Sequence, residues 1–201
     1  TNSPRRLRDT VAYIRTALAY LVNPSGACVM MVTSTLPGEG KSTVASALAS
    51  SMAEAHEKVV LVDVDMRRPK IHTFYGVSSS FGLRDYLEGK IGLEEILLTA
   101  PDSPLIIIPA GTAASNPMNL LNSKRFAELM TELKKRFTRI VLDTPPVTGL
   151  ADALVIFEEQ IDRIVHKNIL ESEKRPDGRK IDELRHIWGE VGVIPRTHGS
   201  G

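Results

Sequence analysis

Four short apolar runs are spaced along the chain, and each one stops at small or polar residues. The runs cover residues 29–32, 59–62, 105–108 and 140–142. Each is continuous rather than alternating and contains β-branched residues, a pattern typical of central parallel strands that are buried on both faces. Because the carboxyl ends of such strands meet at one edge of a sheet, we expect the polar residues after the runs to lie close together.

Helical spacing fills the intervals between these runs. It predicts an amphipathic helix over residues 3–22, a helix over 44–55, and short helices over 82–87 and 93–97. A further helix is predicted after Ser123, which can cap it. Its buried face would consist of Phe126, Leu129, Met130 and Leu133. The alternation of strand and helix predicts the α/β class, with a doubly wound, mainly parallel sheet flanked by helices.

The first apolar run leads into a small-residue turn that ends like a phosphate-binding P-loop, although Thr35 stands where the general pattern has its first Gly. Glycines let the backbone approach an anion, and the N-terminus of the following helix adds partial positive charge. Lys41 can reach the β- and γ-phosphates of a nucleotide, and Ser42 can ligate Mg²⁺. We therefore predict a P-loop NTPase fold that binds ATP or ADP with Mg²⁺. The residues predicted to bind the nucleotide are Pro37, Gly38, Glu39, Gly40, Lys41, Ser42 and Thr43.

Acidic residues follow the second and fourth apolar runs. Asp63 and Asp65 come after the second run, and Asp143 follows the fourth. Mg²⁺ in nucleotide sites is held by one or two carboxylates together with phosphates and water. The predicted metal ligands are Ser42, Asp63 and Asp143, with Asp65 in support.

Three cations, Arg67, Arg68 and Lys70, come next along the chain. The sequence leaves three interpretations open for them: contact with phosphate, contact with an acidic substrate, or simple solvation.

Composition excludes several classes of protein. The chain has 201 residues, of which 42% are hydrophobic and 24% charged, as expected of one globular domain or of one domain with an appendage. The formal net charge of +1 gives no bulk attraction to nucleic acid or to an anionic membrane. A single cysteine, Cys28, excludes a disulfide framework, and no apolar run is long enough to cross a membrane.

These motifs resemble those of the bacterial protein-tyrosine kinases (BY-kinases) of the capsular and exopolysaccharide type, the CpsD/CapB group. The family's Pro-Gly-Glu-Gly-Lys-Ser loop is matched by residues 37–42. Its Asp-x-Asp-x-Arg motif is matched by Asp63, Asp65 and Arg67, and its Walker B motif, Asp-x-Pro, begins at Asp143.

Two further segments extend the resemblance. Residues 111–121 are similar to the family's Gly-x-x-x-x-Asn-Pro-x-x-Leu-Leu loop, and Asp152-Ala153-Leu154 is similar to the segment after Walker B. The resemblance covers roughly residues 1–155. It implies an ATP-dependent protein-tyrosine kinase, an autokinase, that regulates capsular or exopolysaccharide synthesis and export.

The resemblance also implies roles for individual residues. Lys41 and the loop would hold the phosphates, with Arg67 joining the nucleotide site. Asp63 would accept the proton of the tyrosine hydroxyl, Asp65 would support the metal or the base, and Asp143 would hold Mg²⁺. These four residues, Lys41, Asp63, Asp65 and Asp143, are the predicted catalytic set.

Partners and location follow from the resemblance in the same way. It implies a tyrosine-containing protein substrate, a homo-oligomer, and a membrane activator of the polysaccharide chain-length regulator type. That activator would place the protein in the cytoplasm, at the inner face of the cell membrane. The family's acidic-x-x-Arg-x-x-Arg pattern, used in ring assembly, is matched here by Asp9 and Arg15 but has Ala12 between them. No nucleic acid partner is expected of the kinase part.

From about residue 156 the resemblance changes. The last strands of the kinase family are missing, and residues 157–201 resemble a fragment of polynucleotide phosphorylase, most clearly at 175–180 and 195–201. We therefore predict a kinase domain over residues 1–155 and an atypical tail over 156–201. A tail of this length cannot build the core of the phosphorolytic enzyme, so we do not predict RNA phosphorolysis.

Two alternative functions remain open on the sequence. One is a P-loop ATPase of the ParA/MinD type, although Leu36 and Pro37 stand where that group usually has Lys-Gly. The other is a non-catalytic nucleotide-binding remnant in a fused chain, which the foreign tail favours.

Overall fold

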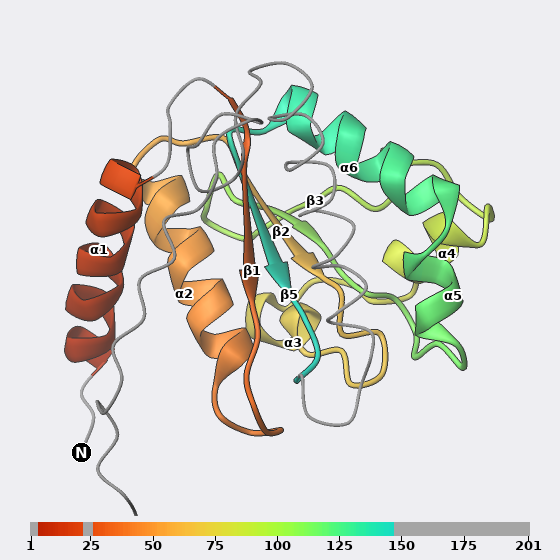
Figure 1. Ribbon diagram of the computed structural model, residues 1–201, viewed down its shortest axis with the longest axis horizontal. Coiled ribbons are helices and arrows are strands. Elements are labelled where there is room, and N and C mark those ends of the chain that lie inside the picture. Colours follow the sequence, from red (N-terminus) through yellow and green to blue (C-terminus); the bar gives the residue numbers. More distant parts are fainter. Residues whose placement is uncertain (1–3, 22–25, 147–201) are drawn as a thin grey trace, which may run out of the picture. The chain divides into compact units, whose positions relative to one another are not determined.

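A five-stranded sheet forms the centre of the computed structural model, which describes residues 4–21 and 26–146. The order across the sheet is β1 (Cys28–Val32), β5 (Arg139–Asp143), β2 (Val59–Asp63), β4 (Ile106–Ile108) and β3 (Leu98–Thr99). The first four are parallel, and β3 runs antiparallel to β4 (Figure 1). The predicted domain boundary after residue 155 and the tail over 156–201 lie outside the described residues.

Helices cover both faces of this sheet. On one side lie α1 (Pro4–Leu21), α2 (Lys41–Glu54) and α3 (Ile71–Tyr75). On the other lie α4 (Leu83–Leu87), α5 (Pro117–Leu121) and α6 (Lys124–Arg136) (Figure 1). The predicted doubly wound α/β fold is confirmed.

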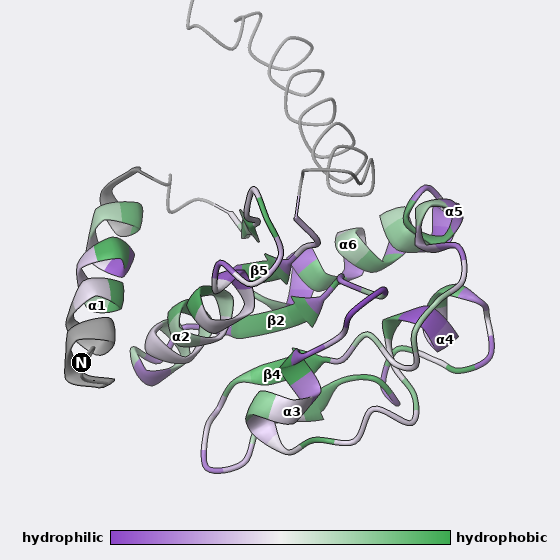
Figure 2. Cartoon of the chain, turned by 90° about the horizontal axis from the view of Figure 1, so that it is seen from below, coloured by the Kyte–Doolittle hydropathy of each residue, from purple (hydrophilic) through white to green (hydrophobic). Residues whose placement is uncertain are grey.

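The strands serve both layers because their side chains alternate between the two faces. In β2, Val60 and Val62 enter the core under α4 and α6, whereas Val59 and Leu61 enter the core under α2. Every residue of β2 is buried, which explains why its sequence is apolar without alternation. Figure 2 shows the strands as a hydrophobic (green) centre of the fold. By the same alternation, Asp63 and Asp143 fall on the α2 face, where the P-loop lies.

The long helices follow the sequence closely. Ser123 caps α6 by accepting a hydrogen bond from the Phe126 N–H at 3.3 Å, as predicted. The buried residues of α6 are Phe126, Leu129, Met130 and Leu133, the face predicted from spacing. Helix α2 buries Ala45, Ala49 and Ala53, and these small side chains let it lie close against the sheet.

The short elements differ from the prediction. The helix predicted over 93–97 is wrong: this segment is a turn, in which the Gly92 N–H donates to Glu95 Oε2, and it leads into β3. Its apolar residues enter the core, but the segment reaches β3 before a helix can propagate. Helices α3 and α5 were not predicted. Pro117 at the first position of α5 is the signal that could have identified that helix.

Candidate nucleotide site

The P-loop is the turn between β1 and α2. Gly38 and Gly40 have φ values of 88° and 92°, in the left-handed region that side chains rarely adopt. Gly40 is the N-cap of α2, and its carbonyl accepts the first helical hydrogen bond from the Val44 N–H at 2.9 Å. Turns of this kind direct backbone N–H groups toward one point, which suits an anion at the N-terminus of α2.

The Glu39 side chain bonds back to the first residues of this loop. Its Oε2 accepts hydrogen bonds from the backbone N–H groups of Thr35 at 2.8 Å and Leu36 at 3.1 Å. From the sequence, Glu39 was predicted to bind the nucleotide, and its hydrogen bonds to Thr35 and Leu36 were not predicted. The carboxylate therefore has a structural role within the loop, holding its first residues against its last.

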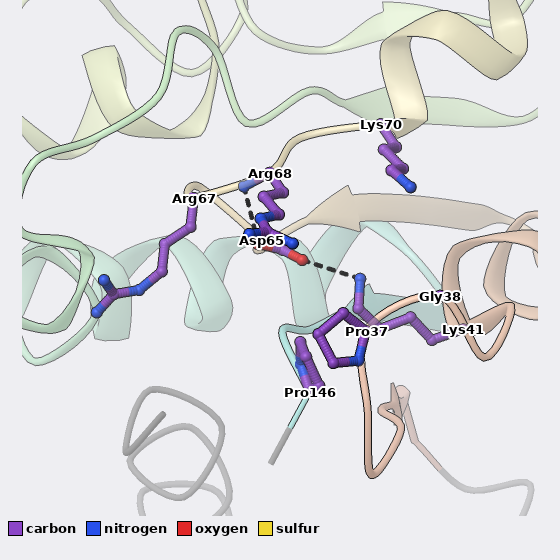
Figure 3. Close-up of a pocket in the computed structure, with 8 residues that line it drawn as sticks. All are labelled: Pro37, Gly38, Lys41, Asp65, Arg67, Arg68, Lys70 and Pro146. Carbon is purple, nitrogen blue, oxygen red and sulfur yellow. Dashed lines mark hydrogen bonds and ion pairs between the residues drawn. The ribbon is translucent and has the colours of Figure 1, made fainter. Parts of the chain in front are cut away.

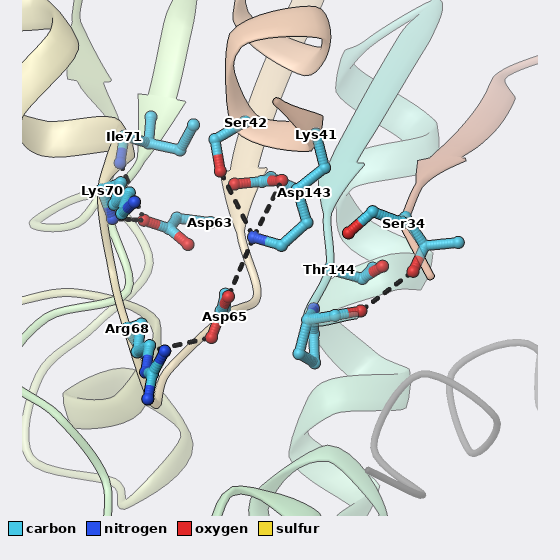
Figure 4. Close-up of polar contacts among 12 residues, drawn as sticks. Ser34, Lys41, Ser42, Asp63, Asp65, Arg68, Lys70, Ile71, Asp143 and Thr144 are labelled. Atoms are coloured by element: carbon cyan, nitrogen blue, oxygen red, sulfur yellow. Dashed lines mark hydrogen bonds and ion pairs between the residues drawn. The ribbon is translucent and has the colours of Figure 1, made fainter. Parts of the chain in front are cut away.

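Lys41 joins the P-loop to the acidic strand ends. Its Nζ lies 2.9 Å from Asp65 Oδ2 and 3.8 Å from Asp143 Oδ1, and it donates to Ser42 Oγ at 3.3 Å. The Lys41 side chain is only 11% exposed, so these charges interact away from bulk water. The structure thus brings Lys41, Ser42, Asp65 and Asp143 together, as Figure 4 shows.

Asp63 and Asp143 are neighbours across the sheet. They occupy the same level of the paired strands β2 and β5, and both are almost completely buried. Asp63 Oδ2 accepts from the backbone N–H groups of Lys70 and Ile71, each at 3.1 Å, while its Oδ1 has no hydrogen-bond partner among the described residues. Within the same residues, neither carboxylate oxygen of Asp143 accepts a hydrogen bond, although Lys41 Nζ lies 3.8 Å from its Oδ1. Each of the two buried carboxylates therefore keeps acceptor capacity that the described residues do not satisfy.

The ionisation of both groups is disfavoured. Burial, and then the charge of Asp143, raise the pKa of Asp63 to about 7, although the N–H groups of Ile71 and Lys70 oppose the shift. Burial also raises the pKa of Asp143, against the effect of the nearby Ser42 hydroxyl and Lys41 ammonium. A cation at this place would remove the cost of both negative charges.

The residues fit Mg²⁺. Within the described residues no cluster of three His, Cys, Asp or Glu side chains could enclose a metal ion. Mg²⁺ does not need such a cluster, because it usually retains water and takes ligands from substrate phosphates. The Ser42 hydroxyl and the unpartnered oxygens of Asp143 are the donors this arrangement offers.

A pocket of about 490 Å³ opens beside these groups. Its wall combines the P-loop with the segment after β2 and with the end of β5 (Figure 3). The lining residues are Pro37, Gly38, Lys41, Asp65, Arg67, Arg68, Lys70 and Pro146. The volume is within the range of small-molecule sites. Asp63 and Asp143 are buried and are not among the residues that line the pocket.

The sequence alone could not identify some of the residues and backbone groups that form this site. Pro146 lines the pocket but carries no functional group that a motif search would select. The amides of Lys70 and Ile71, which hold Asp63, belong to the backbone and would be present with any residue except proline. Thr43 is exposed and is not among the lining residues.

Two threonines fix the distance between the P-loop strand and Asp143. The Thr33 hydroxyl donates to the Pro145 carbonyl at 2.9 Å. Thr144 donates to the Val32 carbonyl through both its N–H and its hydroxyl, each at 3.1 Å. These bonds continue the pairing of β1 and β5 beyond the strands, so the phosphate-binding turn and the acidic strand end move as one unit. Their signal, a threonine after each strand, is too common to be noticed in a sequence.

The comparisons with known proteins agree with this geometry. Residues 28–161 match the family model described as an AAA domain. The chain is 36% identical over 127 residues to the tyrosine-protein kinase YwqD of Bacillus subtilis, which covers 63% of this chain and 54% of that protein. It is 31% identical over 157 residues to a putative tyrosine-protein kinase in the cps region of Klebsiella pneumoniae, covering 78% of this chain and 22% of that protein. The chain therefore spans about half or less of the length of these curated relatives.

Solved structures show the same likeness. The kinase domain of VpsO superposes with a TM-score of 0.67 at 35% identity, covering 87% of this chain and 92% of that domain. The kinase domain of the Escherichia coli tyrosine kinase ETK superposes with a TM-score of 0.70 at 31% identity. The match covers 73% of this chain and 57% of the ETK chain. The cell division ATPase MinD of Pyrococcus furiosus gives 0.56 at 23% identity over 65% of this chain and 54% of MinD, which shows a shared fold only. Within the described residues, no helix is long and apolar enough to cross a membrane.

Proposed function

The chain belongs to the bacterial tyrosine kinases built on this AAA domain, and on that premise we propose that it transfers the terminal phosphoryl group of ATP to tyrosine hydroxyls of proteins. The observation that carries the proposal is the position of Lys41, held between Asp65 and Asp143 at the N-terminus of α2. In P-loop enzymes, phosphoryl transfer uses the loop and its lysine to hold the phosphates and carboxylates at strand ends to hold the metal ion, and this arrangement supplies both sets of groups.

The P-loop wall binds the nucleotide. Lys41 leaves its ion pair with Asp65 to contact the β- and γ-phosphates, and backbone N–H groups of residues 38–43 surround them, with Pro37 lining the pocket beside them. Ser42 and Asp143 would hold Mg²⁺, which when bound would help to neutralise the negative charge of the phosphates. Arg67 lies on the pocket wall, where its charge adds to the attraction for ATP.

Asp63 receives the proton of the tyrosine hydroxyl. Its Oδ2 is fixed by the amides of Lys70 and Ile71, so Oδ1 is the oxygen left to accept the proton, and the proposal requires that the tyrosine gains access to this buried atom. A carboxyl whose pKa lies at about 7 can hold a proton at neutral pH. Asp65, which lines the pocket, positions Lys41 before the nucleotide binds.

The biological setting is proposed from the relatives. Some are tyrosine kinases named for a cps region or as EpsB, and this supports a role in capsule or exopolysaccharide production. We propose a protein substrate with an accessible tyrosine, assembly with other copies, and a membrane activator that brings the kinase to the inner face of the cell membrane. The predicted division into a kinase domain over 1–155 and a tail over 156–201 also stays a proposal.

Phosphotyrosine formation tests the function directly. The protein is incubated with Mg²⁺-ATP and a tyrosine-containing polymer, and phosphotyrosine is quantified. Asp63→Asn keeps the size of the side chain but removes its ability to accept the proton, so the rate should fall about 100-fold. A melt with and without Mg²⁺-ADP should show that the variant still binds nucleotide, with stabilisation of about 2.7 kcal/mol at 100 times the dissociation constant.

The same experiment separates the alternatives. Steady release of phosphate without phosphotyrosine would favour an ATPase of the MinD type. Binding of nucleotide with neither product would indicate a non-catalytic remnant. Phosphotyrosine in the wild type but not in Asp63→Asn excludes both.

A further inference from the structure

Arg68 and Lys70 carry two exposed positive charges at the edge of the pocket. Both residues line it, and they stand on the segment between β2 and α3 (Figure 3). Within the described residues, neither side chain forms a hydrogen bond or an ion pair. Several other surface cations of the described residues are paired, for example Lys124 with Glu128 and Arg136 with Glu132. The charge of Lys70 also acts on the Asp143 carboxylate from a distance, but neither cation is held in a direct pair within the described residues, so both can contact a ligand.

The backbones of the same two residues hold the acidic groups of the site. The Arg68 N–H donates to Asp65 Oδ1 at 3.1 Å, and the Lys70 N–H donates to Asp63 Oδ2 at 3.1 Å. Each side chain therefore starts within one hydrogen bond of a carboxylate that we place in the phosphoryl transfer. Any polypeptide whose tyrosine reaches Asp63 brings its neighbouring residues within reach of Arg68 and Lys70.

The phosphates of the nucleotide have their own binding groups on the opposite wall. Lys41, the loop turns at Gly38 and Gly40 and the N-terminus of α2 all belong to the P-loop. Figure 3 shows Arg68 and Lys70 across the Asp65–Lys41 ion pair from Pro37. Their side of the pocket is therefore the one that the P-loop groups do not occupy.

We infer that Arg68 and Lys70 form a recognition site for acidic residues next to the acceptor tyrosine. The substrate class is a tyrosine-containing segment with Asp or Glu beside the tyrosine, whose carboxylates pair with the guanidinium and the ammonium group. The inference rests on the proposed kinase function, and it names the acceptor that this function would use.

Two synthetic peptides test it. Both contain one tyrosine, which is flanked on each side by Glu in the first and by the isosteric Gln in the second. In the wild type, kcat/KM should be about tenfold higher for the Glu peptide than for the Gln peptide, because the Glu peptide has the lower KM. This ratio of kcat/KM values should fall in high salt. The double variant Arg68→Gln/Lys70→Gln should bring the ratio to within about twofold while leaving the KM for ATP unchanged. Lys124→Gln, an exposed lysine on α6, is the matched control and should keep the wild-type ratio.

Each contrary result has a distinct meaning. Equal kcat/KM for the two peptides in the wild type would overturn the recognition site while the kinase function stands. A double variant that keeps the peptide ratio but raises the KM for ATP would overturn it too, because the two cations would then serve the nucleotide. Absence of phosphotyrosine on both peptides and on a tyrosine polymer would overturn the kinase function itself, and the recognition site with it.

Discussion

The two walls of the pocket use their backbone amides in opposite ways. In the P-loop, the N–H groups of Thr35 and Leu36 donate to a side chain, that of Glu39, and the start of α2 lies toward the pocket. In the segment after β2, backbone N–H groups donate to the protein's own carboxylates, Asp63 and Asp65. One wall is built to receive an external anion, whereas the other is built to fix internal ones.

This difference decides what each wall presents to a ligand. Where the amides are directed at the ligand, the side chains can be small, as in Gly38 and Gly40. Where the amides are used internally, recognition is left to long side chains such as Arg68 and Lys70. The comparison predicts that changes in the P-loop wall affect nucleotide binding, and that changes in the other wall affect the acceptor and the proton.

Loss of Lys41 should have the largest effect. Lys41→Met removes the cation that pairs with Asp65 and lies near Asp143, so phosphotyrosine formation should fall about 1,000-fold. The melt of the variant should also no longer respond to Mg²⁺-ADP. Lys90→Met, whose ammonium pairs with Glu88 away from the pocket, is the control and should behave as the wild type. A variant that keeps a tenth of the activity would contradict the central position of Lys41.

Asp63 should make the metal-free protein less stable as pH rises. Its pKa is raised to about 7, so the stability that the protonated form provides is fully present below pH 4 and is lost between about pH 4 and pH 7. At 1.36 kcal/mol per pKa unit, the loss is at most a few kcal/mol.

Asp63→Asn should not show this loss. The measurement is the free energy of unfolding of both proteins in urea, without Mg²⁺, between pH 4.5 and pH 8. The difference between them should grow with pH. A difference that stays constant would mean that Asp63 ionises as easily in the folded as in the unfolded chain.

Gly40→Ala should cost about 1–2 kcal/mol of stability, because alanine must adopt a φ of 92° at the start of α2. A Cβ at this position meets no atom within 4 Å, so the cost is backbone strain alone. Gly26→Ala is a matched control, since its Cβ would also lie in open space but its φ is not left-handed. Equal melting temperatures for the two variants would exclude strain at Gly40.

Glu39 should give the smallest effect. Glu39→Ala frees the amides of Thr35 and Leu36, which should exchange their hydrogens faster, and it should reduce stability by about 0.5 kcal/mol. Glu39→Gln keeps an acceptor oxygen and should retain part of the protection. Unchanged exchange in Glu39→Ala would show that the loop keeps its shape without this carboxylate.

The sequence predicted one wall of the pocket better than the other. Lys41, Ser42 and the aspartates were selected because their side chains carry the groups that the proposed chemistry needs, and the structure brings Lys41, Ser42, Asp65 and Asp143 close together. The amides that hold Asp63 could not be identified, because a backbone N–H is independent of residue type. Arg68 and Lys70 were noted in the sequence, but their place on the pocket wall was not predicted. Exposed cations have the same sequence pattern whether or not a pocket lies beside them.

The fold shows a similar division. The buried strands and α6 were predicted from long apolar patterns, whose energetics depend mainly on burial. The turn at 93–97 and the strand β3 were not, because three apolar residues at helical spacing pack into a core equally well from a turn. Short elements depend on their tertiary partners more than on their own residues.

The alignment of Val32, Asp143 and Asp63 at one level of the sheet has a consequence for how this chain can change in evolution. Insertion or deletion of a single residue within β2 would turn Asp63 to the face covered by α4 and α6. The apolar residues would find a hydrophobic layer on either side, so such a change would be tolerated by the core. The same change would remove Asp63 from the P-loop face and so destroy the proposed site. Substitutions within these strands can therefore accumulate, while the count of residues between each strand's start and its aspartate is fixed.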